Sequence, residues 1–257
     1  MAIDLSKMRA KLDALQNKDS GDNKFWRPSD GEQAIRIVPT EDGDPFREFH
    51  FHYNVGQNRG FLCPKRNFGD DCPVCEFASQ LWKEGAANDD NEAKKMAKGL
   101  FARQRFFSPV LVRGEEDQGV RAWGYGKMAY ESLLGLVLNP EYGDITDPET
   151  GTDLVLTYGK PSGASFPQTK LTPRRRSSPL CDEAVGGDER CAELLENIPD
   201  FDGLFERKTT DEVSAMLDEY LSGDQSAETS SNETEKYAAT TNTTDPVDAA
   251  FDELMGA

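Results

Sequence analysis

Three cysteines and two histidines that lie close together in the first third of the chain constrain its fold more than any other feature. Cys72 and Cys75 form a Cys-x-x-Cys pair, Cys63 lies nine residues upstream, and His50 and His52 precede it. This spacing is typical of a zinc site, in which four ligands surround the ion as a tetrahedron. Three thiolates and one imidazole fill all four positions and leave none for a substrate. We therefore expect one structural Zn²⁺.

The choice between the two histidines depends on the strand that carries them. Aromatic residues in the segment 49–53 alternate with His50 and His52. This period of two predicts a β-strand with both imidazoles on one face. Either imidazole can then reach the metal, and a site with three thiolates needs only one. We favour His52, because the polar turn that follows can close a hairpin and return Cys63 beside it, and His50 stays as the alternative.

Two other interpretations of the Cys-x-x-Cys pair stay open. One is a redox pair of thiols, although the βαβ surroundings usual for that motif are absent. The other is a set of buried thiols without a ligand. Cys181 and Cys191 stand apart from the metal spacing, and we interpret them as free thiols. Three of five cysteines at metal spacing indicate a reducing compartment, the cytoplasm.

Length and charge set limits on the core. The chain has 257 residues and a formal net charge of -18, with 37% apolar residues. The length suits one large domain or two small ones, and the charge indicates a modest core with solvated or disordered segments. We find neither a run of about 18 apolar residues that would span a membrane nor the apolar core of a signal peptide. We therefore expect no membrane partner.

Apolar periodicity changes along the chain and predicts a mixed α+β fold. Strands are predicted at 34–38, 103–112, 120–126, 152–158 and 165–172. Helices are predicted at 74–82, 93–101, 130–138, 191–198 and 210–221. Strands interrupted by scattered helices favour a mixed sheet or a small barrel over a βαβ series. We expect a core over residues 23–222, with the zinc subdomain at about 46–84.

The first 22 residues differ from this core. Apolar residues at helical spacing are combined with basic ones, and a polar loop follows. We expect residues 1–22 to form a basic arm that contacts a neighbouring copy of the chain, and a helix packed on its own domain is the alternative. The contact residues of the arm would be Lys7, Met8, Arg9, Lys11 and Leu12.

The last segment, residues 223–257, is an acidic tail. From Asp224 onward it contains eight acidic residues and one lysine, and it has too little apolar surface to fold alone. Near its end, Phe251, Leu254 and Met255 are at helical spacing among acids. This tip resembles a peptide that folds on a protein partner. The alternative is a plain solubilising tail.

Basic residues are distributed unevenly along this acidic chain. Residues 93–127 contain eight basic and three acidic residues, and residues 158–178 contain five basic and no acidic ones. Aromatic residues are interspersed among them. Single-stranded nucleic acid is bound by this combination, because cations follow the phosphates and ring faces stack the bases. The alternative is an aromatic core beneath a solvated basic face.

Trp123 and Tyr125 are our best stacking candidates, because strand alternation places both on one face, between Arg121 and Lys127. The whole set of candidate nucleic-acid contacts is Lys94, Lys98, Arg103, Arg105, Phe107, Arg121, Trp123, Tyr125, Lys127, Tyr158, Lys160, Lys170, Arg174, Arg175 and Arg176.

Three short stretches add a resemblance to a known family: Tyr53-Asn-Val-Gly, Leu62-Cys-Pro-Lys and Asp71-Cys-Pro-Val-Cys-Glu. Together with the basic arm, the aromatic-rich core and the acidic tail, they make the chain similar to the single-stranded DNA-binding proteins of T4-like and related tailed phages. The resemblance covers nearly the whole chain. It is specific in the Cys-Pro-Val-Cys stretch and architectural elsewhere.

This resemblance implies an OB-fold, a five-stranded β-barrel, with a small zinc subdomain. It implies cooperative, sequence-independent coating of single-stranded DNA during replication, recombination and repair, in the cytoplasm of a bacterial host. The arm would contact neighbouring copies, and the tail would recruit replication and recombination proteins. The family's ligand set of one histidine and three cysteines maps onto Cys63, Cys72, Cys75 and an upstream histidine. His50 matches the family's spacing better, and His52 matches its His-Tyr context.

Two other classes of function compete with this one. A zinc-dependent nucleobase deaminase would need His-x-Glu before Pro-Cys-x-x-Cys. The chain has no His-x-Glu, and Asp71 precedes Cys72 where that motif has proline, so we expect no enzyme. The remaining alternative is a zinc-ribbon scaffold or transcription factor that recruits replication proteins without gripping DNA. The run Arg174–Arg176 does not match the family pattern, so the groove residues rest on charge and aromaticity alone.

Overall fold

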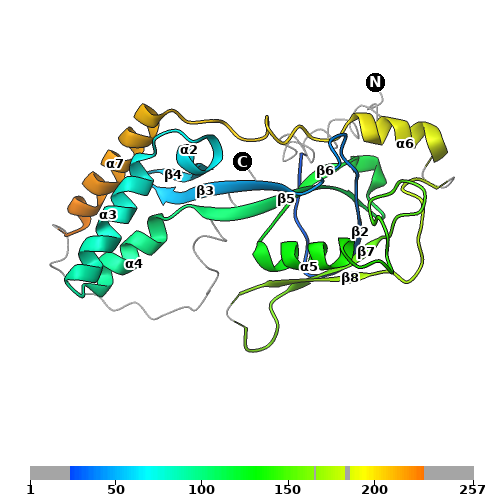
Figure 1. Cartoon of the computed structure of the whole chain (residues 1–257), viewed down its shortest axis with the longest axis horizontal. Coiled ribbons are helices and arrows are strands. Elements are labelled where there is room, and N and C mark those ends of the chain that lie inside the picture. The colour runs from blue at the N-terminus through cyan, green and yellow to red at the C-terminus, as the bar shows by residue number, and fades with distance from the viewer. Residues whose placement is uncertain (1–23, 165, 183–185, 229–257) are drawn as a thin grey trace, which may run out of the picture.

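The computed structural model describes residues 24–164, 166–182 and 186–228, which form a mixed α+β fold (Figure 1). The predicted contacts of the arm (Lys7, Met8, Arg9, Lys11, Leu12) and of the tail tip (Phe251, Leu254, Met255) lie outside these residues. In chain order the elements are β1 (Phe25–Trp26), β2 (Gly31–Ile37), β3 (Arg47–Val55), β4 (Asn58–Leu62), α2 (Pro64–Phe68), α3 (Pro73–Ala87), α4 (Asn91–Leu100), β5 (Arg103–Val112), the 3₁₀ helix η2 (Glu116–Gln118), β6 (Arg121–Tyr125), α5 (Lys127–Val137), β7 (Leu154–Gly159), β8 (Gln168–Pro173), α6 (Gly187–Glu196) and α7 (Thr210–Glu228).

The strands form one open sheet with β5 at its centre. The main path runs β1-β6-β5-β2-β7-β8, and the β3–β4 hairpin branches from β5. The first half of β5 pairs with β3, from Arg103 opposite Phe51 to Phe107 opposite Arg47, and its last residues pair with β2. The β1–β6 pair is parallel and the other pairs are antiparallel. Among the described residues β1 and β8 do not pair with each other, so the strand ladder is open and not a closed five-stranded barrel.

Strand β5 connects the two ends of the molecule. At one end, the tip of the β3–β4 hairpin lies among the helices α2, α3, α4 and α7 (Figure 1). We call these helices, together with β4, the metal lobe. At the other end β2, β6, β7 and β8 enclose the largest core cluster together with α5. A second cluster lies over β3 and β5, where the segment 198–205 runs between α6 and α7 (Figure 1). Phe205 packs there with ring centroids 4.9 Å from Phe51 and 5.2 Å from Phe107.

The last helix is longer than the sequence predicted. Helix α7 continues to Glu228, past the predicted boundary of the core at residue 222. Its first half buries Val213 and Leu217 against the rest of the metal lobe. None of the described helices is long and apolar enough to cross a bilayer.

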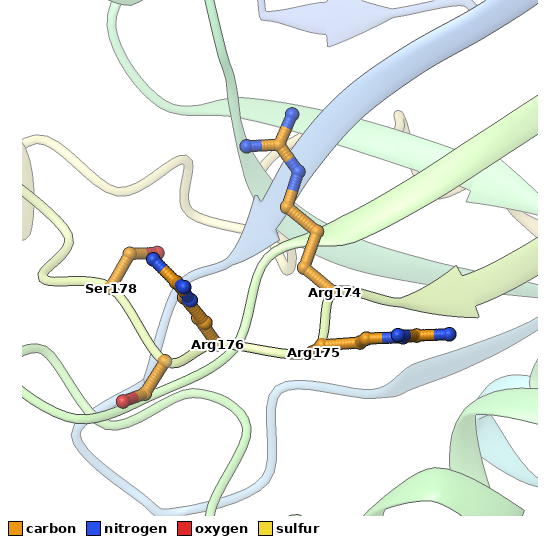
Figure 2. A pocket seen from close by; sticks show the side chains of 5 residues that line it. Arg174, Arg175, Arg176 and Ser178 are labelled. Atoms are coloured by element: carbon orange, nitrogen blue, oxygen red, sulfur yellow. The ribbon is translucent and has the colours of Figure 1, made fainter.

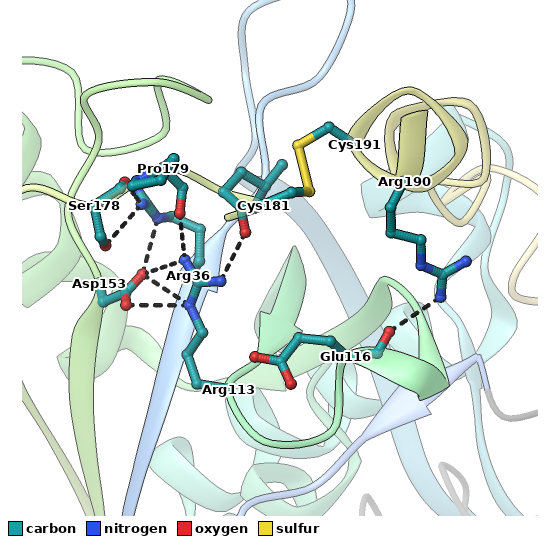
Figure 3. The surroundings of a disulfide bond; sticks show 10 residues. Arg36, Arg113, Glu116, Asp153, Ser178, Pro179, Cys181, Arg190 and Cys191 are labelled. Carbon is teal, nitrogen blue, oxygen red and sulfur yellow. Dashed lines mark hydrogen bonds and ion pairs between the residues drawn. A yellow bond between two sulfur atoms is a disulfide. The ribbon is translucent and has the colours of Figure 1, made fainter. Parts of the chain in front are cut away.

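The prediction that Cys181 and Cys191 are free thiols is wrong, because the structure joins them in a disulfide (Figure 3). Their Cα atoms are 5.6 Å apart, within the range that a disulfide requires. The bond connects the loop after β8 to α6, and Cys181 lies in a buried cluster with Leu180 and Leu194. Sequence spacing alone could not reveal this pair, since the folded chain brings the two residues together.

Replacing both Cys181 and Cys191 with serine should lower the free energy of unfolding by about 2–3 kcal/mol, since a loop of this length loses that much closure entropy when cross-linked. Urea unfolding of the variant and of wild-type protein measures the difference. Wild-type protein in excess dithiothreitol is the control and should show the same decrease. An unchanged midpoint in both samples would contradict the bond.

Candidate metal centre and nucleic-acid interface

The structure brings His52, Cys63, Cys72 and Cys75 together in the metal lobe. Their ligand atoms all lie within 4.8 Å of one another, and three of the four residues are buried. His52 Nε2 is 3.3 Å from Cys72 Sγ and 3.5 Å from Cys75 Sγ, and Cys63 Sγ is 3.5 Å from Cys75 Sγ. This group could hold one metal ion.

The local sequence explains how the thiols converge. Cys63 and Cys72 are the N-cap residues of α2 and α3, and each is followed by proline at the first helical position, where a missing N–H costs nothing. Cys75 lies in the first turn of α3. A helix N-terminus carries partial positive charge, which favours thiolates there. Gly69, with φ 80, ends α2 in the left-handed conformation and turns the chain toward the second pair of cysteines.

Of the two histidines, only His52 belongs to the group. His52 lies on β3 and is fully buried, and its Nδ1 is 2.8 Å from the Leu100 carbonyl oxygen. A proton on Nδ1 donated to that oxygen leaves the Nε2 lone pair facing the thiols, which is the usual outer-shell arrangement of a metal-binding imidazole. His50 instead lies 3.7 Å from Glu48 at the lobe surface. The period-two interpretation of the strand is confirmed, although the two imidazoles on its one face meet different surroundings.

Asn67 ties β3 to the cysteine turn. Its side-chain amide donates to the carbonyl oxygens of His50 (2.7 Å) and Cys63 (2.9 Å), and the His50 N–H donates to its Oδ1 (2.9 Å). The Cys63 N–H also donates to the His50 carbonyl (2.8 Å). These bonds fix the turn independently of any ion. The sequence pattern did not single out Asn67.

The electrostatics of the group favour a cation. Burial lowers the pKa of the His52 imidazole, but hydrogen bonds to Cys63 and Cys72 outweigh burial and raise that pKa to about 9. Hydrogen bonds from Cys72 and Cys75 lower the pKa of the Cys63 thiol, and hydrogen bonds with Cys63 and Cys72 raise that of Cys75. The thiols thus compete for one negative charge. A bound divalent cation would remove the conflict, since a coordinating thiol is deprotonated outright.

The donor set and its spacing fit zinc. Tetrahedral Zn²⁺ with Zn–S of about 2.3 Å and Zn–N of about 2.0–2.1 Å requires ligand atoms roughly 3.6–3.8 Å apart. The separations of 3.3–3.5 Å given above are close to that requirement. When bound, the ion would supply a cross-link between β3, α2 and α3. Soft thiolates and imidazole suit Zn²⁺, whereas hard cations prefer oxygen ligands.

Most of the predicted basic contacts are at the surface. Lys98 lies on α4 near Arg103 at the start of β5, Lys127 begins α5, and Lys160 follows β7. Further exposed members of the set are Lys170, Arg174, Arg175 and Arg176, and half-buried ones are Lys94, Arg105 and Tyr158. Acidic neighbours neutralise the charge of some of these cations, since Lys94 pairs with Asp89 at 2.8 Å and Lys127 pairs with Glu131 at 3.5 Å.

Four predicted contacts are buried instead. Trp123 and Tyr125 are only 1% and 4% exposed, and both belong to the main core beside α5. Phe107 is fully buried under Phe205, and Arg121 is buried in an ion pair with Glu115 at 2.6 Å. The expectation that Trp123 and Tyr125 offer open ring faces for stacking is therefore wrong. Alternation placed them correctly on one face of β6, but that face lines the core.

The exposed rings lie elsewhere, at positions that the sequence analysis did not select. Trp82 on α3 is 37% exposed, and the Lys98 ammonium lies 5.6 Å from its ring centroid. Phe68 at the end of α2 is 39% exposed beneath the Arg207 guanidinium, at 4.2 Å. Phe166, in the loop between β7 and β8, is 41% exposed. Each of these rings lies near a cation in space or in sequence, which charge and aromatic counts along the chain could not reveal.

A mixed sheet with a buried His/Cys group at one end, and with cations and open rings around it, is an arrangement suited to a nucleic-acid-binding module. A family model described as "gp32 DNA binding protein like" matches residues 29–220. The chain belongs to this gp32-like family of single-stranded DNA-binding proteins, which is not a family of enzymes. The family resemblance drawn from the sequence is thereby confirmed. No curated protein matches the chain.

Proposed function

We propose that this protein coats single-stranded DNA cooperatively and without sequence preference, during replication, recombination and repair of phage DNA. The family match over residues 29–220 carries the proposal. We propose in addition that one structural Zn²⁺ occupies the His/Cys group. Residues 1–22 would contact the neighbouring copy on the strand, and the acidic tail would recruit replication and recombination proteins.

Strand order supports an OB-type unit within the open sheet. The strands β2, β5, β6, β7 and β8 are paired in the order β6-β5-β2-β7-β8, with α5 between the third and fourth in sequence. OB-folds are partly open five-stranded barrels that bind oligonucleotides with the face of their second and third strands and with the loops after the first and fourth. Here β3, β4 and the lobe helices α2, α3 and α4 are inserted after the first strand, β2, and the loop 160–167 follows the fourth, β7.

These two insertions carry exposed rings together with exposed cations. The metal lobe supplies Lys98 and Trp82, with Arg103 next to it at the start of β5, and the β7–β8 loop supplies Lys160 and Phe166. The outer face of β3 and β5 is partly covered by Phe205. We therefore infer that single-stranded DNA is bound mainly by the metal lobe and the β7–β8 loop. Exposed rings can stack bases of any identity, which accounts for binding without sequence preference.

A fluorescence titration tests the proposal. Oligo-dT and duplex DNA of equal length are titrated at two salt concentrations. We expect tighter binding to the single strand and a steep loss of affinity with salt, because cations that neutralise phosphates release counterions. Affinity that is equal for both DNA forms, or that does not change with salt, would contradict it.

Replacing Trp82 with alanine should weaken oligo-dT binding by about 1–3 kcal/mol, the contribution of one stacked base. The Lys98 ammonium lies 5.6 Å from the centroid of the exposed Trp82 ring, and the ring of Phe101 packs beside it with centroids 6.3 Å apart. Trp82→Phe is the matched control and should keep most of the affinity, since it retains a ring face. Equal affinities of the alanine variant and wild type would remove Trp82 from the binding surface.

A further inference from the structure

The loop Arg174–Ser178 combines three consecutive arginines with two serines at the end of β8. An open pocket of about 400 Å³ is lined by these residues (Figure 2). Arg175 and Arg176 are exposed, and within the described ranges neither has an ion-pair partner. The loop is therefore a concentrated positive charge on a strongly acidic chain.

The loop is held rigidly from below by a buried network (Figure 3). Arg36 is fully buried and bonds to Asp153 at 3.1 Å, and its guanidinium also donates to the Ser178 carbonyl oxygen. Arg113 bonds to Asp153 at 2.9 Å and donates to the carbonyl oxygens of Leu180 (2.7 Å) and Pro179 (2.9 Å). A rigid loop loses little conformational entropy when it binds a ligand.

Backbone bonds complete the support. The Arg174 N–H donates to the Asp153 carbonyl at 2.9 Å, and the Ser178 N–H donates to the Gly151 carbonyl at 3.0 Å. Gly151 is required here, because a Cβ atom at this position would lie 2.3 Å from Arg36 Nη1. Both ends of the arginine run are thus fixed by residues from three distant parts of the chain.

The positive charge around the loop is only partly compensated. Asp153 is the shared carboxylate of Arg36, Arg113 and Arg174, and its contact with Arg174 is long, at 3.8 Å. Asp147 also attracts Arg36, so two negative charges face three guanidinium groups, and Arg175 and Arg176 add two more positive charges. Such a surface attracts anions at long range.

The arrangement of the three side chains selects the kind of anion. Figure 2 shows Arg174, Arg175 and Arg176 pointing in different directions, with Arg176 toward Ser178 and Arg175 away from it. In this arrangement the three guanidinium groups do not converge on the place of one phosphate group. A chain of phosphates that passes over the loop can contact all three.

The loop also lies far from the metal lobe. Asp153 contacts Arg113, directly after β5, whereas Arg103 and the lobe are at the start of β5. Ten residues of strand extend over roughly 30 Å. A strand of DNA must be long to reach both places.

We propose that the loop Arg174–Ser178 is a second contact for single-stranded DNA, which binds successive backbone phosphates at the end of the sheet remote from the metal lobe. This inference rests on the proposed function. It implies that long oligonucleotides gain affinity and salt dependence from a contact that short ones do not reach.

The test compares full-length wild type with R175Q/R176Q, using oligo-dT of about 4 and about 16 nucleotides, the two ends of the range for OB-folds. Each phosphate contact contributes about 0.7 to the salt slope on a single strand. For the long oligonucleotide we expect the slope of the variant to be lower by about 1.4, and for the short one we expect no change. R175K/R176K keeps the charge and should keep the slope.

K24Q/R27Q is the matched control, since it removes the same charge from two exposed residues that flank β1, outside both the metal lobe and the arginine loop. An equal decrease in slope for this control, or an equal decrease on both oligonucleotides, would overturn the proposal by showing a general charge effect. A second result would also overturn the proposal: R175Q/R176Q binds long oligo-dT like wild type but no longer binds a free peptide of residues 229–257. The loop would then be a binding site for the acidic tail. If wild type binds neither oligonucleotide, the proposed function itself fails.

Discussion

Replacing Cys72 with serine should abolish stoichiometric zinc binding and unfold the metal lobe. Structural zinc supplies about 10–16 kcal/mol in small zinc domains, which equals or exceeds the whole stability of a typical domain. Cys72 is fully buried, caps α3 and belongs to a cluster that includes Val213 and Leu217 of α7. Loss of the ion should therefore loosen α3, α4 and α7 together.

Elemental analysis of the metal content and amide hydrogen exchange measure this effect. We expect one zinc per wild-type chain, none in Cys72→Ser, and loss of exchange protection in α3 and α7. A chelator added to wild type should reproduce the result and weaken oligo-dT binding, because Lys98, Arg103 and Trp82 depend on the lobe for their positions. His50→Ala is the matched control on the same strand and should retain the ion. Wild-type protein that contains no metal would sink the zinc proposal.

The sequence predicted local features of this site well. Alternation along β3, the Cys-x-x-Cys pair and the amphipathic helix that contains the last cysteine are all present, because each depends on residues that are near one another in the chain. The Cys-Pro pairs, at Cys63 and Cys72, encode two helix starts in the same way. The helix α2 was missed, since its five residues are too short to show periodicity.

Features that depend on distant contacts were predicted poorly. Trp123 shares a face with Tyr125 as expected, but only the pairing of β6 with β5 and the packing of α5 decide that this face is buried. The apolar stripe of α3 likewise includes Trp82, and the structure leaves that ring partly open because the helix packs through other residues. The disulfide and the cover supplied by Phe205 also join residues that are separated in sequence.

Asp153 is the second position at which a single substitution should have a large effect. Asp153→Asn keeps the shape of the side chain and removes the charge that faces Arg36, Arg113 and Arg174. Arg36 is fully buried and would lose its compensating charge, which destabilises proteins by about 3–5 kcal/mol. Urea unfolding should show a lower midpoint with an unchanged m-value, the signature of lost stability in the same folded state.

Two further variants separate this network from ordinary ion pairs. Glu193→Gln breaks the pair of Arg190 with Glu193 on α6, whose carboxylate side chain is 59% exposed, and should cost about 0.5 kcal/mol or less. Arg36→Met combined with Asp153→Asn should recover part of the loss, because the one fully buried guanidinium that lacks its counter-charge is then replaced by an apolar side chain. If Asp153→Asn cost no more than Glu193→Gln, the loop Arg174–Ser178 would owe its rigidity to backbone bonds alone. The salt slope of Asp153→Asn on long oligo-dT would then equal that of wild type, because the arginines above the network would keep their positions.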